Sequence, residues 1–438
     1  MTELTILGGG PAGLGLAYYA QRAGRPFVLY EKSEALGGMC RTLEHGAHRF
    51  DAGAHRFHDR DAEVTADLRA LMGEELLPVK APSQVWSRGR LIDFPPTPLN
   101  AAFSYGVAGS VRIGLELLAA RLRPLPVVSF EDFALSRFGA TLAQELLLNY
   151  SEKLWGLPAC QLSPDVATRR LGGMTWRSLL MEVLLPGRKS AHIDGQFLYP
   201  RGGYGAISER LASAVPREAL QTGFEVGSFE LKGGKVVRVG FANGKSAEVS
   251  GRVVSTLPVT LLVRLLGDAL PNDARAAAAA LRFRKIRLIF LRLNVPRVSK
   301  NASIYIPESK YCVCRVYEPK NRSAQMAPEG ETSLVAEVPC FSGDELDRLS
   351  DETLGERVAG ELTAIGLISR ESVLERRHIA LPHAYPVYTV GYEKQVKVIT
   401  GALSRVSNLD TLGRAGSFYY SHLHDQLRLA KDYIAGLP

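Results

Sequence analysis

The first 31 residues constrain the fold more than any other part of the chain. A short β-prone run over residues 2–7 is followed at once by a glycine-rich turn, Gly8-x-Gly10-x-x-Gly13. Residues 14–22 then have the apolar spacing of a helix, and a second apolar strand over residues 26–30 ends at Glu31. This order of strand, glycine turn, helix, strand and acid predicts a βαβ unit at the start of the chain.

The spacing of the turn is that of a Rossmann-type dinucleotide-binding site. Glycines at these positions allow a tight turn and let a pyrophosphate approach the N-terminus of the helix, where free N–H groups and the helix dipole favour negative charge. Pro11 and Ala12 belong to the same turn and are predicted to bind the cofactor with the glycines. Glu31 lies 18 residues after Gly13, where an acid is expected to bind a ribose hydroxyl, and Lys32 is placed beside it.

A second pair of glycines indicates which dinucleotide is bound. The segment Gly37-Gly38-Met39-Cys40-Arg41 follows closely after Glu31. It resembles the flavoprotein signature in which two glycines and a following arginine pass beside the pyrophosphate, and a nicotinamide dehydrogenase has no reason to place one there. The resemblance implies that the cofactor is FAD, with Gly38, Met39 and Arg41 among the residues that bind it.

The composition is ordinary for a globular protein and argues against several function classes. Hydrophobic residues make up 46% of the chain and charged residues 22%. The formal net charge is +8, but the lysines and arginines form no polybasic block, so no nucleic-acid binding is predicted and an anionic substrate stays open. The cysteines, five in number, are scattered, so neither a disulfide framework nor a metal site is expected.

The chain is not expected to span a membrane. Its most apolar region, residues 99–118, is interrupted by polar side chains. The N-terminus enters a strand without a leader, which favours a cytoplasmic protein. Residues 101–123 have apolar faces and arginines that would suit a bilayer interface, but ordinary helix packing explains the same pattern, so no firm membrane association is predicted. The sequence predicts no oligomeric state.

Beyond residue 80 the pattern alternates between helical and β-rich stretches. A hairpin with its turn at Gly89 is predicted over residues 86–95, helices dominate residues 101–155, and a β-rich stretch spans residues 286–338 before a closing helix over 425–434. We therefore expect a discontinuous nucleotide-binding domain with two insertions. Its parts are residues 1–80, 196–270 and 376–438, and the insertions are a mainly helical substrate domain over 81–195 and a β-rich one over 271–375.

Further motifs along nearly the whole chain resemble those of one large flavoprotein group. They are Gly53-Ala54-His55-Arg56-Phe57-His58, Tyr150-Ser151-Glu152-Lys153-Leu154-Trp155-Gly156, Tyr199 to Gly205, Tyr385-Pro386-Val387-Tyr388 and Gly413-Arg414. The chain is thus similar to the FAD-dependent oxidoreductases of the protoporphyrinogen-oxidase-like and amine-oxidase-like group, which includes UDP-galactopyranose mutase. The first two motifs resemble the mutase and its oxidoreductase-like relatives more than the amine oxidases.

This resemblance implies an α/β fold in which a discontinuous Rossmann-type FAD-binding domain carries inserted helical and mixed-sheet substrate domains. It also implies that Gly413 and Arg414 lie beside the flavin and its pyrophosphate, that Val226 offers backbone bonds to adenine, and that His55 is close to the isoalloxazine ring. Ala54 stands where the group usually has glycine or proline, and residues 418–425 follow its pattern only loosely. These departures leave the substrate class open.

Three residues are candidates for catalysis. His55 and His58 lie three apart on a predicted strand, so only one can face the flavin, and the resemblance favours His55; a purely structural histidine is an equal alternative. Arg170 and Arg315 are nearest by position to the arginines that hold the substrate diphosphate in the mutase, and a guanidinium suits such an anion. A solvated or salt-bridged arginine is the alternative for each.

The motifs lead to three functional hypotheses. The first is an oxidoreductase that passes a hydride from a small-molecule substrate to flavin, and the alternative is a flavin-dependent isomerase of the mutase kind that acts on a nucleotide sugar. The third, a flavin-binding protein without turnover, fits poorly with long insertions rich in aromatic residues. Five aromatic residues are candidates for a wall over the flavin, or else for core positions: Tyr150, Trp155, Tyr199, Tyr385 and Tyr388.

Overall fold

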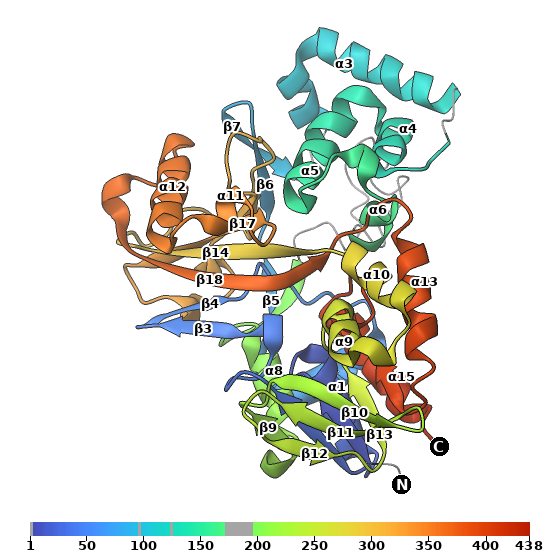
Figure 1. Ribbon diagram of the computed structural model, residues 1–438. Helices are drawn as coiled ribbons and strands as arrows, with labels where there is room; N and C mark the ends of the chain where they lie inside the picture. The colour runs from blue at the N-terminus through green and yellow to red at the C-terminus, as the bar shows by residue number, and fades with distance from the viewer. Residues whose placement is uncertain (1–2, 95–97, 123–125, 171–195) are drawn as a thin grey trace.

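The computed structural model describes residues 3–94, 98–122, 126–170 and 196–438. In Figure 1 both termini lie at the bottom, in the part of the molecule that contains α1 (Pro11–Arg22) and β13 (Arg252–Ser255). The long strands β14 (Phe283–Leu293) and β18 (Val373–Pro386) cross the middle. The helices at the top are α3 (Pro98–Leu122), α4 (Phe130–Ala143), α5 (Asn149–Trp155) and α6 (Asp165–Arg170).

A five-stranded parallel sheet forms the nucleotide-binding part. Its strand order is β19 (Leu409–Thr411), β13, β1 (Leu4–Leu7), β2 (Phe27–Glu31) and β9 (Leu220–Thr222). All four residues of β1 are buried, as expected for the centre of a sheet covered on both faces. Strands from the start, the middle and the end of the chain lie side by side, which confirms the predicted discontinuous Rossmann-type fold.

The helix after the glycine turn packs against this sheet at very short range. A Cβ built on Gly13 would lie 1.9 Å from the carbonyl oxygen of Gly8, so only glycine allows α1 to start this close to β1. A Cβ on Gly15 would lie 2.9 Å from Leu427 of α15 (Leu423–Ala435). The predicted closing helix is thereby confirmed, and it covers α1.

A mixed seven-stranded sheet forms the second layer. Its order is β18, β14, β17 (Thr332–Cys340), β16 (Arg315–Tyr317), β15 (Ser303–Tyr305), β6 (Ser83–Ser87) and β7 (Arg90–Phe94). β15 pairs with β6 in parallel and the other pairings are antiparallel. Apolar residues of α12 (Asp351–Ala364), among them Leu354 and Val358, pack on Ile289 and Leu291 of β14. The predicted hairpin around Gly89 is confirmed as β6 and β7.

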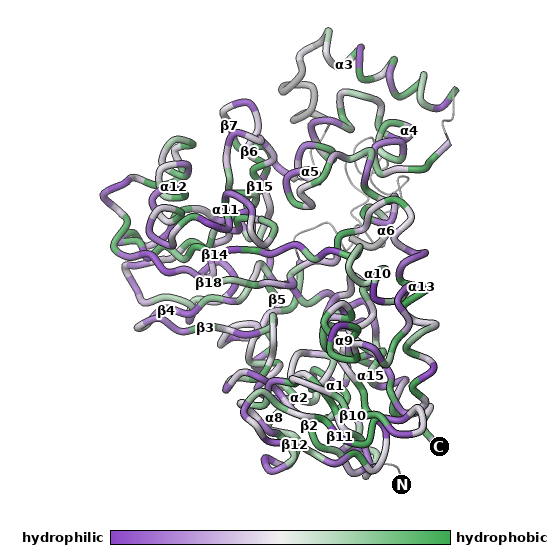
Figure 2. The backbone as a smooth tube through the Cα atoms, in the orientation of Figure 1, coloured by the Kyte–Doolittle hydropathy of each residue, from purple (hydrophilic) through white to green (hydrophobic). Residues whose placement is uncertain are grey.

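Smaller elements complete the structure. The remaining strands are β3 (Thr42–His45) with β4 (His48–Asp51), β5 (Leu76–Lys80) with β8 (Gln196–Pro200), and the sheet of β10 (Val226–Lys232), β11 (Lys235–Phe241) and β12 (Ser246–Glu248). The other helices include α2 (Ala62–Met72), α8 (Gly205–Ser213), α9 (Val259–Leu266), α10 (Asn272–Ala280), α11 (Glu345–Arg348), α13 (Tyr392–Leu403) and α14 (Gly413–Gly416). Figure 2 shows α9 as a hydrophobic helix, and it buries Val259, Leu262, Val263 and Leu266.

The segment that carries His55 and His58 is not a strand but an irregular loop in which only Phe57 bridges Leu198. The proposed domain boundaries are crossed by a sheet, since β6 and β7 belong to the same seven-stranded sheet as β14 and β18, and β18 itself spans residue 375.

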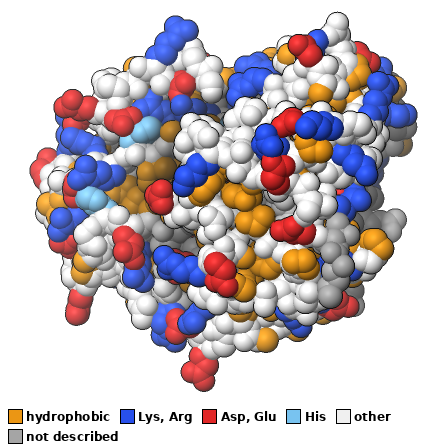
Figure 3. Space-filling model, turned by 60° about the horizontal axis from the view of Figure 1, so that its bottom comes forward, with side chains coloured by type: hydrophobic (Ala, Val, Ile, Leu, Met, Phe, Trp, Pro, Cys, Tyr) orange, Lys and Arg blue, Asp and Glu red, His pale blue; other side chains and the backbone are white. Residues whose placement is uncertain are grey.

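The surface view agrees with the spread of charge along the sequence. Figure 3 shows basic and acidic side chains interspersed over the face it presents, without a region of one sign. Of the helices in the described ranges, none is long and apolar enough to cross a membrane.

Candidate functional site

A cavity of about 720 Å³ lies between the parallel sheet and the seven-stranded sheet. Nearly all of the residues that the sequence predicts at the cofactor line this one hollow. They are Gly8, Gly10, Pro11, Ala12, Glu31, Lys32, Gly38, Met39, Arg41, His55, Val226, Gly413 and Arg414. The exception is Gly13, which packs against Gly8 below the turn.

One end of the cavity is a cradle of backbone at the N-terminus of α1. Gly10 precedes the helix and no side chain caps its first turn, so the free N–H groups face the cavity. Two other glycines approach the same point from distant segments. A Cβ on Gly38 would lie 3.1 Å from the Cα of Gly10, and one on Gly413 would lie 2.7 Å from the Cβ of Ala12. This glycine-lined space fits a pyrophosphate.

Glu31 closes the β2 side of the cradle. One carboxylate oxygen accepts a hydrogen bond from the Gly9 N–H at 2.7 Å, and the other accepts one from the Ser33 N–H at 2.9 Å. The carboxylate therefore fixes the glycine turn while it lines the cavity. Tyr30, Phe224 and Val226 lie next to it and offer an apolar surface for a flat ring.

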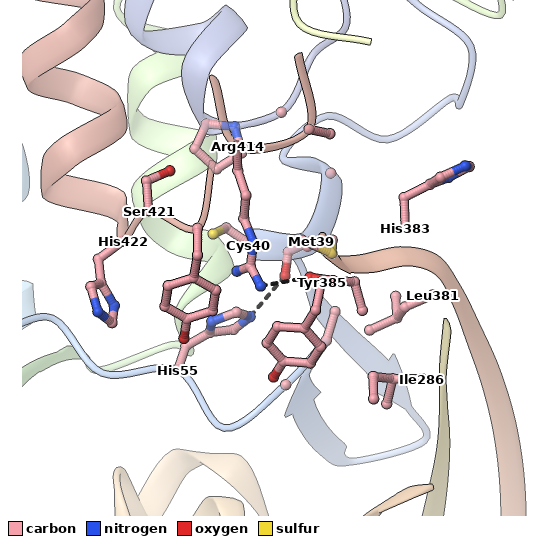
Figure 4. Close-up of a pocket in the computed structure, with 18 of the residues that line it drawn as sticks. Met39, Cys40, His55, Ile286, Leu381, His383, Tyr385, Arg414, Ser421 and His422 are labelled. Atoms are coloured by element: carbon pink, nitrogen blue, oxygen red, sulfur yellow. Dashed lines mark hydrogen bonds between the residues drawn. The ribbon is translucent and has the colours of Figure 1, made fainter. Parts of the chain in front are cut away.

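Several buried polar atoms at the cavity have no hydrogen-bond partner among the described residues. They are the Arg414 Nε, the Ser421 Oγ and the His422 Nε2, and all three residues line the cavity (Figure 4). Because an unsatisfied buried donor costs free energy, these atoms fit a ligand with many acceptors. FAD, with its pyrophosphate and ribityl oxygens, meets that requirement.

Arg414 is positioned by its neighbours. Its Nη2 donates to the Ala384 carbonyl at 2.6 Å, and its guanidinium carbon lies 4.8 Å from the ring centre of Tyr385 and 4.4 Å from that of Tyr420. The two tyrosine rings are nearly parallel, 5.9 Å apart. The guanidinium is thereby held at the cavity wall with Nε still unpaired. Arg41 is fixed in another way, since its Nε donates to the Gly38 carbonyl at 3.0 Å.

His55 lies in the same wall, next to Met39 and Arg414 (Figure 4). Its Nε2 donates to the Met39 carbonyl at 2.8 Å, and its ring stacks on Tyr204 with centres 4.9 Å apart. Gly53 packs beneath the ring, since a Cβ there would lie 3.3 Å from Nε2. Burial lowers the pKa of His55, so the imidazole is neutral near pH 7. His58 also lines the cavity, and burial lowers its pKa to about 3.

Arg315 lines the cavity but already has a carboxylate partner. Its Nε and Nη2 donate to the two oxygens of Glu337 at 2.9 and 2.7 Å, and the Glu337 side chain is only 2% exposed. Burial acts to lower the pKa of Arg315, but Glu337 outweighs it and holds that pKa above its usual range. The salt-bridged alternative therefore describes this arginine. Arg170 ends α6, and its side chain lies outside the described part of the chain.

The predicted aromatic wall is divided between cavity and core. Tyr150 and Tyr385 line the cavity, whereas Trp155, Tyr199 and Tyr388 are completely buried away from it. Sequence reasoning missed other residues that line it: Arg56, Phe130, Tyr305 and Tyr420. Arg56 stands inside the motif around His55, so its place in that motif could have singled it out.

Lys153, in the middle of the second specific motif, has a structural role. Its Nζ donates to the carbonyls of Ile306, Glu308 and Val313 at 2.6–2.9 Å, and it does not line the cavity. It thus fixes the loop that follows β15. The glycine that ends the motif, Gly156, has a φ of 71° and packs against Arg284.

Comparisons with known proteins agree with this geometry. The profile of a protein family described as flavin containing amine oxidoreductase matches residues 11–393. Among solved structures, reduced UDP-galactopyranose mutase superposes with a TM-score of 0.85 at 22% identity, over 99% of this chain and 95% of that one. A protein from Exiguobacterium sp. 255-15 assigned as a protoporphyrinogen oxidase gives 0.77 at 22%, over 99% and 98%. Putrescine oxidase bound to putrescine gives 0.68 at 17%, over 99% and 98%. These likenesses establish a shared fold.

Proposed function

The chain belongs to the family of flavin-containing amine oxidoreductases, and we propose that it oxidises a small-molecule substrate by hydride transfer to bound FAD. The observation that carries the proposal is one continuous cavity, which joins a glycine-lined nucleotide cradle to a chamber walled by aromatic side chains. Membership in this family makes the chain a flavin-dependent enzyme, so a flavin-binding protein without turnover is set aside.

We assign the cofactor to the residues that line the cradle. Gly8, Gly10 and Ala12 would hold the pyrophosphate with Arg414, Glu31 would bind the ribose, and Val226 would face the adenine. Bound FAD supplies the two-electron acceptor for the hydride. The protein residues then have to place the substrate carbon and keep water away from it.

His55 and the paired tyrosines are assigned to the reaction end of the cavity. The Nε2–H of the neutral His55 donates to the Met39 carbonyl, so His55 holds the loop and does not donate that proton to a substrate. Tyr385 and Tyr420 present a continuous aromatic surface beside Arg414. Such a surface excludes water and orients a flat or apolar substrate.

An isomerase of the mutase kind, acting on a nucleotide sugar, is the second candidate. The guanidinium groups at the cavity favour it, since Arg315 and Arg56 both line the chamber and a diphosphate would suit them. The Glu337 carboxylate argues against it, because it already neutralises Arg315. We therefore rank oxidation first.

The reaction is assigned to the cytoplasm. None of the five cysteines, which all lie in the described ranges, forms a disulfide, and four of them are buried, which is typical of proteins kept in a reducing compartment. For the domains we propose the three-part nucleotide-binding domain with two insertions, in which the seven-stranded sheet is shared among both insertions and the last part.

One experiment separates the candidates. The purified protein, reconstituted with FAD, is mixed without oxygen with panels of amines, cyclic lipids and nucleotide sugars while the flavin absorbance is followed. Bleaching of the oxidised flavin by one of them supports the oxidoreductase. Conversion of a nucleotide sugar only after dithionite reduction, with no net redox change, would instead support the isomerase. A protein that takes up no FAD would overturn both.

A further inference from the structure

Arg56 lines the cavity, and its guanidinium is held by neutral groups alone. Its Nη2 donates to the Ser83 hydroxyl at 2.8 Å and to the Ser303 hydroxyl at 3.3 Å, and its guanidinium carbon lies 5.1 Å from the ring centre of Phe197. Within the described ranges no carboxylate lies within ion-pair distance of Arg56, and neither Nε nor Nη1 makes a hydrogen bond. The Nε–H and Nη1–H donors are thus left for a ligand.

The charges around Arg56 are positive as well. Burial lowers its pKa to about 10; Tyr305 acts to raise that pKa, and the neighbouring Arg322 and Arg315 act to lower it. Glu337 offsets the charge of Arg315, but Arg322 is only 3% exposed and donates to the Ala302 carbonyl alone. Its Nε and Nη1 have no partner among the described residues. A cation so enclosed is costly without a counter-ion, and the described residues provide none.

The position of Arg56 separates it from the nucleotide cradle. Ser83 and Ser303 face each other across β6 and β15, and two residues further along the same strands Val85 faces Tyr305. Val85 and Tyr305 line the same cavity. The side chain of Arg56 therefore belongs to the seven-stranded sheet and not to the N-terminus of α1, where the phosphates of FAD are assigned.

The walls at this end are aromatic and apolar. Tyr150 makes an edge contact with Tyr305, with ring centres 5.4 Å apart, and Phe130 lies in the same lining. Two acids in the lining, Glu145 and Glu337, are paired with Arg88 and Arg315. An occupant would therefore meet one uncompensated guanidinium within a largely apolar chamber.

We propose that Arg56 binds an anionic group of the substrate, a carboxylate or a phosphate, attached to an apolar body that packs on Tyr150 and Tyr305. This deepens the proposed function, on which it rests for the assignment of this end of the cavity to the substrate. The Nε–H and Nη1–H groups, which Ser83 and Ser303 leave unused, can donate charge-assisted hydrogen bonds to either oxyanion. The positive field of Arg322 adds to the attraction.

The test is a binding titration of the FAD-loaded protein that requires no turnover. Benzoate, phenyl phosphate, benzamide and benzylamine share one ring and differ in charge, and binding is read from the flavin absorbance and by calorimetry. We expect benzoate or phenyl phosphate to bind at least about tenfold more tightly than benzamide, and the better of the two identifies the oxyanion. Equal or tighter binding of benzamide or benzylamine would overturn the proposal.

Variants locate the effect. Arg56→Gln should weaken the binding of the anion about tenfold or more while the FAD content is unchanged. Arg56→Lys should retain part of the affinity for the anion. Arg69→Gln, which removes the same charge from an exposed position on α2, is the matched control and should bind as the wild type does. If Arg56→Gln fails to fold, Ser303→Ala takes its place. This variant keeps the charge of Arg56 but removes one of the two hydroxyls that hold its guanidinium, so the affinity for the anion should change. Anion affinity unchanged by both Arg56→Lys and Ser303→Ala would contradict the assignment.

The outcomes of this test are distinct from those of the proposed function. Arg56-dependent anion binding to a protein that oxidises nothing would leave the anion site in place and remove the oxidase. Oxidation of a neutral or cationic substrate that is insensitive to Arg56→Gln would leave the oxidase in place and remove the anion site.

Discussion

Gly413 lies so close to Ala12 that a Cβ built on the glycine would be 2.7 Å from the Cβ of the alanine. The glycine has a φ of +87°, in the left-handed region that other residues avoid. The contact joins α14, which follows the last strand of the parallel sheet, to the first turn of α1. Both ends of the chain therefore meet at the point where the pyrophosphate is assigned.

The first prediction concerns this contact. Gly413→Ala should lower FAD occupancy strongly, because the methyl group forces α14 away from α1 and the backbone strain costs about 1–3 kcal/mol. Occupancy is measured from the flavin absorbance after gel filtration. Gly401→Ala, at an exposed position of α13 with no atom near the new Cβ, should keep its FAD. Full occupancy in Gly413→Ala would show that this contact does not shape the cofactor site.

The second prediction is a pH dependence of stability at Asp61. Its carboxylate accepts two hydrogen bonds from Arg428 at 2.7 Å, which ties α2 to α15, and this holds its pKa at about 2. The folded pKa is below the ordinary value, so the stabilisation is complete above about pH 4 and is lost as the pH falls through about 2.

Asp61→Asn tests this. The amide oxygen can still cap α2 through the Val64 N–H, but the ion pair is removed. We expect the free energy of unfolding to fall by about 1 kcal/mol at pH 7, measured by urea denaturation, and the difference from wild type to shrink toward pH 2. A difference that stays constant over this range would contradict the ion-pair explanation.

The third prediction uses the neutral state of His55. Burial lowers its pKa, so the unfolded chain takes up a proton near pH 6.5 while the folded chain does not. The free energy of unfolding should therefore decrease as the pH falls through 6.5. His55→Gln can keep a donor for the Met39 carbonyl and lacks the titration, so it should lose less stability than wild type between pH 7.5 and 5.5. Equal losses in the two proteins would count against a neutral, buried His55.

The parts of the fold that depend on local spacing were predictable. The glycine turn, Glu31 and the closing helix are encoded within short segments, and the sheet brings them together because parallel strands put their carboxyl ends at one edge. Gly413 and Arg414 were placed by resemblance to a family motif, and they line the same cavity as the turn.

The substrate end was not predictable in this way, because its geometry depends on pairs from distant strands. Arg56 reaches Ser83 and Ser303, and Arg315 finds Glu337 only where β16 pairs with β17. No local sequence pattern predicts such partners. Lys153 shows that a motif can also mislead. It stands in one of the more specific motifs, yet its Nζ donates to three carbonyls of a loop and does not line the cavity.

The fourth prediction follows from the Arg315–Glu337 pair. Removing Glu337 should strengthen the binding of an anion, because the guanidinium of Arg315 then lacks its carboxylate partner and faces the cavity uncompensated. Glu337→Gln should bind benzoate on the order of tenfold more tightly than wild type, which corresponds to about 1.4 kcal/mol of restored attraction.

Glu337→Gln should also be less stable than wild type, since the broken buried pair costs about 3–5 kcal/mol. The double variant Arg315→Met, Glu337→Gln removes both charges of this pair and leaves neither one buried alone, so it should recover stability and lose the added affinity. If Glu337→Gln binds benzoate no better than wild type does, Arg315 does not face the bound anion and Arg56 alone attracts it.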